Sequence, residues 1–202
     1  MIAIVDYGAG NLRSVQNTLK HVGAETKTVS QPGELDGVDK IVLPGVGAFG
    51  AGMAALRDSG FVEPIIQAAK AGVPLLGICL GMQYLFEASE EMGVHQGLGL
   101  LPGRVVKFPA NGPLVPHIGW NQLHIRQANP LLRGVNEGDY AYFVHSYYVE
   151  AADPNDILAS TDYGLNYASV VGRGNIFGIQ CHPEKSQHVG QRILRNFVED
   201  IR

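Results

Sequence analysis

The first half of the chain alternates between short strand-like runs and amphipathic segments. Residues 1–6, 26–29 and 40–43 are predicted to form strands, and Val73–Ile78 is almost wholly apolar, as expected of a strand buried on both faces of a sheet. Helices are predicted between and after these strands, at about residues 12–22, 51–58, 61–71 and 82–91. Such alternation is typical of an α/β fold with a mainly parallel sheet and helices on both faces.

In the second half, short strand-like runs follow one another with no helical segment between them. They are predicted at residues 104–108, 121–125, 140–149, 157–161 and 168–171. Strands joined only by turns pair antiparallel, so we expect hairpins that extend the sheet, although their order stays open. The run 176–180 is predicted to return to the parallel core. Ile193, Phe197 and Ile201 recur at helical spacing and predict a closing amphipathic helix over residues 187–201.

Composition narrows the class of protein. The 202 residues are 46% hydrophobic and 17% charged, which suits one domain over residues 1–202 and excludes a disordered or coiled-coil chain. The net charge is −4 and basic residues are scattered, so nucleic acid is not an expected partner. There is no charged leader and no apolar run long enough to span a membrane. The two cysteines suit a reducing cytoplasm better than a disulfide framework, so we expect a cytoplasmic protein.

Cys79 follows the apolar run 73–78 within the sequence Gly-Ile-Cys-Leu-Gly. Gly77 and Gly81 permit a tight turn and a close approach that a Cβ would block. The pattern is the cysteine counterpart of the Gly-x-Ser-x-Gly elbow, which exposes a nucleophile at the carboxyl end of a strand. The helix that follows would present its positive end to the sulfur and favour the thiolate. The alternative is that Cys79 is a small buried hydrophobic residue, and the motif alone does not decide between the two.

A second cluster, Gln-Cys-His-Pro-Glu at residues 180–184, ends the last predicted strand. Side chains two residues apart share one face of a strand, so His182 and Glu184 are expected to lie together while Cys181 points away. Glu184 could then hold one imidazole nitrogen while the other faces a thiol, as in a triad of nucleophile, base and orienting carboxylate. His-Pro-Glu alone also fits a surface histidine beside a turn. Together with the Cys79 elbow, however, it favours a catalytic triad.

Residues 44–50, Pro-Gly-Val-Gly-Ala-Phe-Gly, follow the third predicted strand. Their glycines would let backbone amides point toward a ligand, and ligands of open α/β sheets gather at the carboxyl ends of strands. Such amides, with the amide of Leu80, could hold a developing oxyanion. The alternative is a glycine-rich connection to the next helix, and only a nearby thiolate gives the oxyanion interpretation weight.

These motifs together resemble the class I, or triad, glutamine amidotransferases, whose fold is flavodoxin-like. More narrowly, the chain resembles the glutaminase subunits of imidazole glycerol phosphate synthase. The resemblance covers essentially the whole chain, from the opening Ile-Val-Asp-Tyr-Gly-Ala-Gly-Asn to the last helix. The stretches that carry it most clearly are residues 44–47, 77–83, 117–121 (His-Ile-Gly-Trp-Asn), 142–148 and 182–186.

What the resemblance implies is hydrolysis of glutamine to glutamate and ammonia, with no cofactor and no metal. Cys79 would attack the side-chain amide, His182 would pass its proton to the departing ammonia, and Glu184 would orient His182. Water would then release glutamate from the thioester. The oxyanion hole would be formed near Gly47 and Leu80. The residues that lie around the glutamine would be Gln83, His145, Ser146 and Tyr147.

By the same resemblance, the ammonia passes to a cyclase subunit, a (β/α)₈ barrel, within a heterodimer that serves histidine biosynthesis. Trp120, expected in a turn, and Lys185 would belong to the face that meets the cyclase, although a lone tryptophan is also common in a core. The glutaminase of this family is nearly idle until the cyclase holds its ligand. A peptide of residues 44–47 that turns to complete the oxyanion hole could supply this switch.

Other interpretations stay open at this point. Gln83 could be an ordinary polar residue in the first turn of a helix, and residues 142–148 could be an aromatic strand of the core. The chain could be a glutaminase subunit that serves pyridoxal phosphate or anthranilate synthesis. It could also be a non-enzymatic regulatory module, although such a module would not need Cys79, His182 and Glu184 together.

Overall fold

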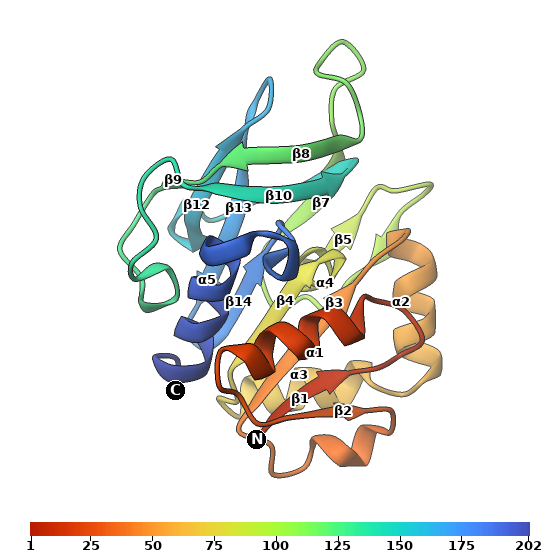
Figure 1. Cartoon of the computed structure of the whole chain (residues 1–202). Coiled ribbons are helices and arrows are strands. Elements are labelled where there is room, and N and C mark those ends of the chain that lie inside the picture. Colours follow the sequence, from red (N-terminus) through yellow and green to blue (C-terminus); the bar gives the residue numbers. More distant parts are fainter.

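A twelve-stranded sheet runs through the computed structural model, which describes residues 1–202 (Figure 1). Its parallel part has the order β2 (Thr26–Val29), β1 (Ile2–Val5), β3 (Lys40–Gly45), β4 (Leu75–Cys79) and β14 (Ile176–Ile179). The sheet continues through β13 (Asn166–Arg173), β11 (Tyr147–Ala151), β7 (Gly103–Lys107), β5 (Ala88–Ser89) and β6 (His95–Gln96), while β12 (Ile157–Asp162) pairs with β13 and β9 (His124–Ile125). The predicted α/β architecture, mainly parallel with antiparallel extensions, is confirmed.

Helices cover both faces of the parallel strands. The α-helices are α1 (Leu12–His21), α2 (Phe49–Asp58), α3 (Val62–Lys70), α4 (Leu80–Tyr84) and α5 (Gln187–Glu199). Because successive strand residues point to opposite faces, Ile4 and Leu76 join the core under α1 and α5, whereas Val5 and Leu75 join the core under α2 and α3 (Figure 1). None of these helices is long and apolar enough to cross a membrane.

The region between β7 and β11 forms a separate two-stranded sheet of β8 (His117–Gln122) and β10 (Tyr140–His145). The prediction of one strand over residues 140–149 is therefore wrong, because the chain leaves β10 at Ser146 and enters β11 in the large sheet. Trp120 was expected in a turn but lies within β8, paired with Tyr142. The predicted strand 121–125 is divided between β8 and β9. Such breaks depend on strand pairing, which local composition does not encode.

The helix expected over residues 82–91 is also mostly absent. The helix after Cys79 ends at Tyr84, and Ala88–Ser89 pairs instead with β6 and β7. All residues of α4 are buried, so packing rather than an amphipathic pattern holds this short helix. The ladder formed at Ala88–Ser89 overrides the helix propensity of the segment.

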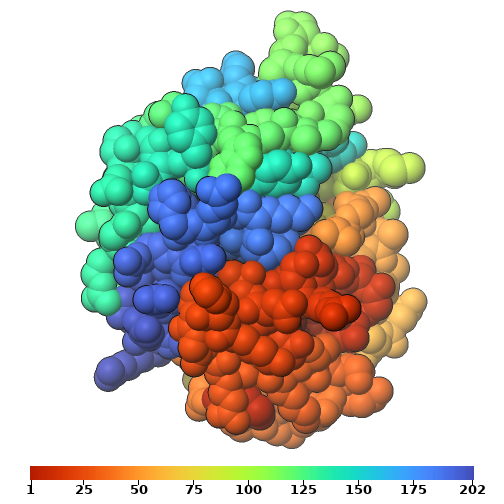
Figure 2. Space-filling model, in the orientation of Figure 1, coloured from red at the N-terminus to blue at the C-terminus, as the bar shows by residue number.

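Lys40, the first residue of β3, ties this strand to the end of the last helix. Its Nζ donates to the backbone oxygens of Phe197, Val198 and Ile201 at 2.6–2.7 Å. These carbonyls have no partner within the helix, so the ammonium both caps α5 and neutralises the negative end of its dipole. Figure 2 shows α5, in blue, seated between the red and orange N-terminal part and the green and teal middle of the chain.

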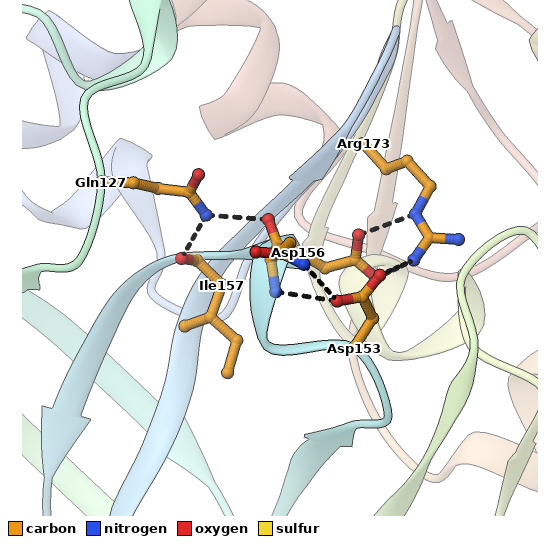
Figure 3. Close-up of polar contacts among 6 residues, drawn as sticks. Gln127, Asp153, Asp156, Ile157 and Arg173 are labelled. Atoms are coloured by element: carbon orange, nitrogen blue, oxygen red, sulfur yellow. Dashed lines mark hydrogen bonds and ion pairs between the residues drawn. The ribbon is translucent and has the colours of Figure 1, made fainter.

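An ion-pair cluster fixes the connection from β11 to β12, a 3-10 helix at Pro154–Asp156 (Figure 3). Arg173 of β13 donates from Nε and Nη2 to the two carboxylate oxygens of Asp156, at 2.7 and 2.8 Å, and from Nη2 to Asp153 at 3.0 Å. The side chain of Asp156 is only 3% exposed, so Arg173 is the counterion of a buried carboxylate. The connection is thereby held against the sheet.

Candidate active site

The candidate active site is built around Cys79, where β4 ends and α4 begins. Cys79 has φ 55° and ψ −111°, a left-handed backbone conformation that few non-glycine residues adopt. A Cβ at Gly77 would collide with the backbone of Gly81, and one at Gly81 would collide with the carbonyl of Leu43. The tight turn predicted from the glycines is present, and it places the cysteine at the carboxyl end of the strand.

His182 and Glu184 meet, but not as neighbours on a strand. The last strand ends at Ile179, and Pro183–Lys185 forms a 3-10 helix after His182. His182 Nδ1 and Glu184 Oε1 are 2.9 Å apart, and the two side chains are only 5% and 1% exposed. The backbone amide of His182 donates to the carbonyl of Tyr142 at 2.9 Å, which anchors the histidine to β10. The expected His182–Glu184 pair thus forms through a turn.

The environment of His182 favours the imidazolium. Burial by itself would lower its pKa, but hydrogen bonds to Cys79 and Glu184, with the negative charge of each, raise the pKa to about 10. His182 is therefore protonated at neutral pH. Because Nδ1 faces Glu184, Nε2 is the nitrogen that can hold a proton toward the sulfur of Cys79. Cys181 takes no part, since its complete burial raises its pKa to about 12 and keeps it a thiol.

A cavity of about 290 Å³ opens over the sulfur. It is lined by all the predicted site residues except Glu184 and Trp120, namely Gly47, Cys79, Leu80, Gln83, His145, Ser146, Tyr147, His182 and Lys185, the last of which was expected at the partner face. Gly47 has φ 98°, a conformation that favours glycine, and it lines the cavity. Glu184 does not line the cavity but contacts His182, which does. Trp120 does not line the cavity either. The glycine loop and the elbow therefore border one cavity, as the sequence predicts.

Sequence reasoning missed Glu91, which also lines the cavity. Its carboxylate accepts a hydrogen bond of 2.6 Å from the amide of Phe49, the first residue of α2. A carboxylate at a helix N-terminus satisfies a free amide and interacts well with the helix dipole. Glu91 thus anchors the end of the glycine loop, and no local pattern links it to residue 49.

A second missed group is His117, which contacts His145 beneath the cavity. Its Nδ1 lies 3.2 Å from Nε2 of His145, and Asn121 Nδ2 lies 3.3 Å from its Nε2. Asn121 also donates to the carbonyl of Asp162, so its nitrogen must face His117 and Nδ1 of His117 must carry the proton. His145 in turn donates from Nδ1 to the carbonyl of Tyr147 at 2.8 Å. The tautomers of both histidines follow from this chain of donors.

Both histidines are held neutral. Burial lowers the pKa of His117 to about 4 and that of His145 to about 3, and the carbonyl of Tyr147 only partly opposes this for His145. His145 therefore acts as a fixed hydrogen-bonding group beside the cavity and not as a second base. Neither pKa is accessible to sequence reasoning, because β8 and β10 must pair before the two rings meet.

Gln83 is more constrained than sequence reasoning expected. Its Nε2 donates to the carbonyl of Tyr147 at 3.1 Å and to Oε1 of Gln180 at 3.0 Å. Both hydrogens of the amide nitrogen are thereby used, so only Oε1 of Gln83 remains for a ligand. The side chain is 3% exposed and borders the cavity.

The outer face of the two-stranded sheet borders the same cavity. Ile118 and Trp120 are 60% and 45% exposed, and the rings of Trp120 and Tyr142 lie 6.0 Å apart. Lys185 Nζ lies 5.6 Å above the ring of Tyr142 and also lines the cavity, as does Val144. We call this surface, formed by Ile118, Trp120, Tyr142, Val144 and Lys185, the mouth face. It is apolar, aromatic and continuous with the entrance to Cys79.

Comparison with known proteins identifies relatives across the whole chain. The profile of the family described as "Glutamine amidotransferase class-I" matches residues 3–201. The "Imidazole glycerol phosphate synthase subunit HisH" of Desulfitobacterium hafniense (strain Y51) is 52% identical over 197 residues, 98% of this chain and 93% of that protein. The protein of the same name from Syntrophotalea carbinolica (strain DSM 2380 / NBRC 103641 / GraBd1) is 50% identical over 203 residues, 98% of each chain.

Solved structures share the fold at much lower identity. One described as "Structure of PurLQS from Thermotoga maritima" superposes with a TM-score of 0.80 and 22% identity, over 100% of this chain and 98% of that chain. One described as "Crystal structure of glutamine amidotransferase" gives a TM-score of 0.78 and 20% identity, over 98% of each chain. The fold is therefore retained where most side chains differ.

Proposed function

The chain belongs to the class I glutamine amidotransferases and is the glutaminase subunit of an imidazole glycerol phosphate synthase, and from this premise we propose that Cys79, His182 and Glu184 catalyse the hydrolysis of glutamine. The observation that carries the proposal is the contact of 2.9 Å between His182 and Glu184 at the cavity that holds the Cys79 elbow. We further propose that residues 1–202 act as one domain, since the family profile matches nearly all of them.

In the first half of the reaction, the thiolate of Cys79 attacks the side-chain carbonyl carbon of glutamine. The carbonyl oxygen becomes an oxyanion, which the backbone amides near Gly47 and Leu80 would stabilise. As the tetrahedral species collapses, His182 gives its proton from Nε2 to the departing nitrogen, and ammonia leaves behind a thioester. Glu184 keeps the imidazole oriented and lowers the energy of the imidazolium before transfer.

In the second half, the neutral His182 takes a proton from water, and the hydroxide attacks the thioester. The carbon–sulfur bond breaks, glutamate leaves, and the thiolate and imidazolium are restored. One histidine thus serves first as general acid and then as general base. General acid-base catalysis of this kind accelerates a reaction by about 10²–10⁴-fold.

Recognition of glutamine would fall to the residues that line the cavity. Gln83 can only accept through Oε1, so it would meet an N–H group of the substrate. His145, Ser146 and Tyr147 would form the opposite wall, with the neutral His145 holding the carbonyl of Tyr147 in place. The chain needs no cofactor for this reaction, because every bond change uses the side chains already named.

The ammonia would pass to a cyclase subunit that docks on the mouth face. This face combines an exposed tryptophan, a tyrosine and a lysine at the entrance to the cavity, and aromatic residues are enriched at interface hot spots. Trp120 and Lys185 would contact the partner, as the sequence predicts. The relatives named for this synthase favour the cyclase as partner over the enzymes of pyridoxal phosphate or anthranilate synthesis.

Both cysteines are free, which fits our expectation of a reducing cytoplasm.

The test is glutamate release from glutamine by the purified chain, with and without the cyclase subunit and its nucleotide ligand. We expect strong stimulation by the liganded cyclase and no release from the Cys79→Ala variant in any mixture. Release that survives Cys79→Ala would remove Cys79 as nucleophile. A wild-type chain that releases no glutamate with any partner would overturn the proposed function itself.

A further inference from the structure

Gln180 lies beside the nucleophile, and the triad does not use it. It follows the last residue of β14, its backbone amide donates to the carbonyl of Ser169 at 2.9 Å, and it is 0% exposed. Its Nε2 lies 3.7 Å from the sulfur of Cys79, within the range of an N–H···S hydrogen bond. A fully buried amide is costly unless its hydrogen bonds are made, so its placement calls for a reason.

The neighbouring residues determine which end of this amide faces the sulfur. The carbonyl of Tyr147 can only accept, so the atom of Gln83 that lies 3.1 Å from it must be the nitrogen. That nitrogen also lies 3.0 Å from the amide of Gln180, whose facing atom must therefore be the oxygen. The remaining atom of Gln180, its NH₂ group, is then the one that faces Cys79. The orientation follows from donor and acceptor chemistry alone.

We propose that Gln180 is a further catalytic residue, which donates an amide hydrogen bond to the thiolate of Cys79. A neutral thiol sulfur is a weak acceptor, whereas a hydrogen bond to a charged group is about twice as strong as one between neutral groups. The bond therefore stabilises the thiolate relative to the thiol. The proposal rests on the proposed function only in that Cys79 is the nucleophile.

A neutral donor suits this position. Gln180 stabilises negative charge on sulfur but has no proton to lose, so His182 remains the only group that moves protons. The bond is strongest when the sulfur is an anion, before attack on glutamine and again when the thioester breaks and the thiolate leaves. It contributes in both half-reactions without changing their balance of protons.

Other titratable groups near the sulfur do not duplicate this role. Cys181, Tyr7, Tyr84 and Tyr167 all have raised pKa values, for which burial is the main cause, and they stay neutral at physiological pH. The imidazolium of His182 interacts directly with the sulfur. The thiolate is thus held by an imidazolium and an amide.

The experiment measures the reactivity of Cys79 without glutamine. The full-length chain is alkylated with iodoacetamide across a range of pH, and the rate is followed by mass spectrometry. The Gln180→Met variant keeps the side-chain length but cannot donate, and Gln180→Glu still accepts from Gln83 but places a carboxylate against the sulfur. At a pH below the midpoint of the wild-type alkylation profile, we expect the rate to fall about tenfold in Gln180→Met and further in Gln180→Glu. The pH of half-maximal rate should rise by about one unit.

A matched control separates this effect from loss of stability. Asn196 of α5 is another buried amide, which donates to the carbonyls of Leu131 and Arg133 at 2.9 and 2.8 Å. Asn196→Asp makes the same chemical change as Gln180→Glu at a residue that does not line the cavity, and its alkylation profile should match that of the wild type. Equal shifts in both variants, or unchanged midpoints in the two Gln180 variants, would overturn the proposal. Cys79→Ala reports any labelling of Cys181.

A measurement on the unaltered sequence covers the case in which the Gln180 variants do not fold. In the ¹⁵N-labelled wild-type chain, the side-chain NH₂ resonance of Gln180 should shift as Cys79 ionises, and the shift should vanish in Cys79→Ala. A Gln180 resonance whose chemical shift does not change when Cys79 ionises would overturn the inference. Failure of the proposed function is distinct, because it appears as absent glutamate release while alkylation and NMR still report on the hydrogen bond.

Discussion

The positive charge of His182 is stabilised from two sides, by Glu184 at Nδ1 and by Cys79. Glu184→Gln keeps an acceptor for Nδ1 but removes the negative charge, so the pKa of His182 should fall from about 10 toward 6.5. We expect kcat for glutamate release to fall about 10²-fold, and the limb of the pH profile that reports His182 to move to lower pH. A profile with unchanged limbs would show that the carboxylate only positions the ring.

Acid should destabilise the fold through the two neutral histidines. The pKa values of His117 and His145, about 4 and 3, lie below the 6.5 of an unfolded chain. The unfolded state therefore takes up protons first as the pH falls, and the stability present above pH 6.5 is lost toward pH 4 and 3. Linkage gives a loss of about 1 kcal/mol per histidine between pH 6 and 5. His182 contributes little in this window, because it is charged in the folded state and mostly charged in the unfolded state.

Urea unfolding at pH 6 and pH 5 measures this loss directly. His117→Gln removes one of the two titrating groups, so its stability should fall less between the two pH values than that of the wild type. Carboxylates contribute equally to both proteins and cancel in the comparison. Identical losses would mean that His117 accepts a proton in the folded state.

Among single residues, the sequence singles out the proposed triad but not the groups that support it. Cys79, His182 and Glu184 lie in compact motifs whose chemistry can be recognised without knowledge of the fold. His117 and Gln180 also lie in or beside such motifs, yet their roles depend on contacts with β10 and α4. Those contacts require strand register, which is set by the whole sheet.

At the scale of elements, the junction of β4 and α4 depends on the absence of one methyl group. A Cβ at Gly81 would collide with the carbonyl of Leu43 in β3, and neither strand can move without breaking the ladder between them. Gly81→Ala should therefore cost more than about 3 kcal/mol of unfolding free energy, above the usual range for overpacking. Gly33→Ala is the control, because Gly33, like Gly81, lacks a positive φ but has nothing within 4 Å of its Cβ. Equal losses would show that the collision with Leu43 is not what makes the change at Gly81 costly.

The connection between β11 and β12 offers a second test at this scale (Figure 3). Arg173→Leu leaves the carboxylate of Asp156 buried without its counterion, which should lower the urea midpoint markedly. The double variant Arg173→Leu with Asp156→Leu removes both charges and should recover much of that loss. A double variant no more stable than Arg173→Leu would show that the charge of Asp156 is not what makes the single change harmful.

The elements themselves were predictable where their signals are local. Every helix of the parallel half except α4 lies within two residues of its predicted position, because apolar spacing and the intervening strands mark it. The antiparallel half was harder. Residues 140–149 look like one strand, and only the pairing of β10 with β8 and of β11 with β7 divides them at Ser146. Long-range pairing decides such boundaries.

In the whole molecule, the large sheet and the small sheet meet at the cavity. β4 and β14 bring Cys79 and the turn that holds His182 from one side, while β10 and the segment after it bring His145 and Tyr147 from the other. The mouth face lies mainly on the outer surface of the small sheet, so a partner seated there touches the same strand whose inner face supports the candidate site. Binding at the mouth face can therefore bias the arrangement around Cys79.

The last prediction concerns the mouth face. Trp120→Ala removes an exposed aromatic anchor and should weaken binding of the cyclase subunit by about 2 kcal/mol, or roughly 30-fold in Kd. Lys185→Ala should reduce the stimulation of glutamate release while leaving the fold intact, and Lys70→Ala, at the end of α3, should change neither quantity. Titration calorimetry gives the affinity and glutamate release gives the stimulation. Wild-type affinity in Trp120→Ala together with full stimulation in Lys185→Ala would place the cyclase on another surface, and ammonia would then need another route out of the cavity.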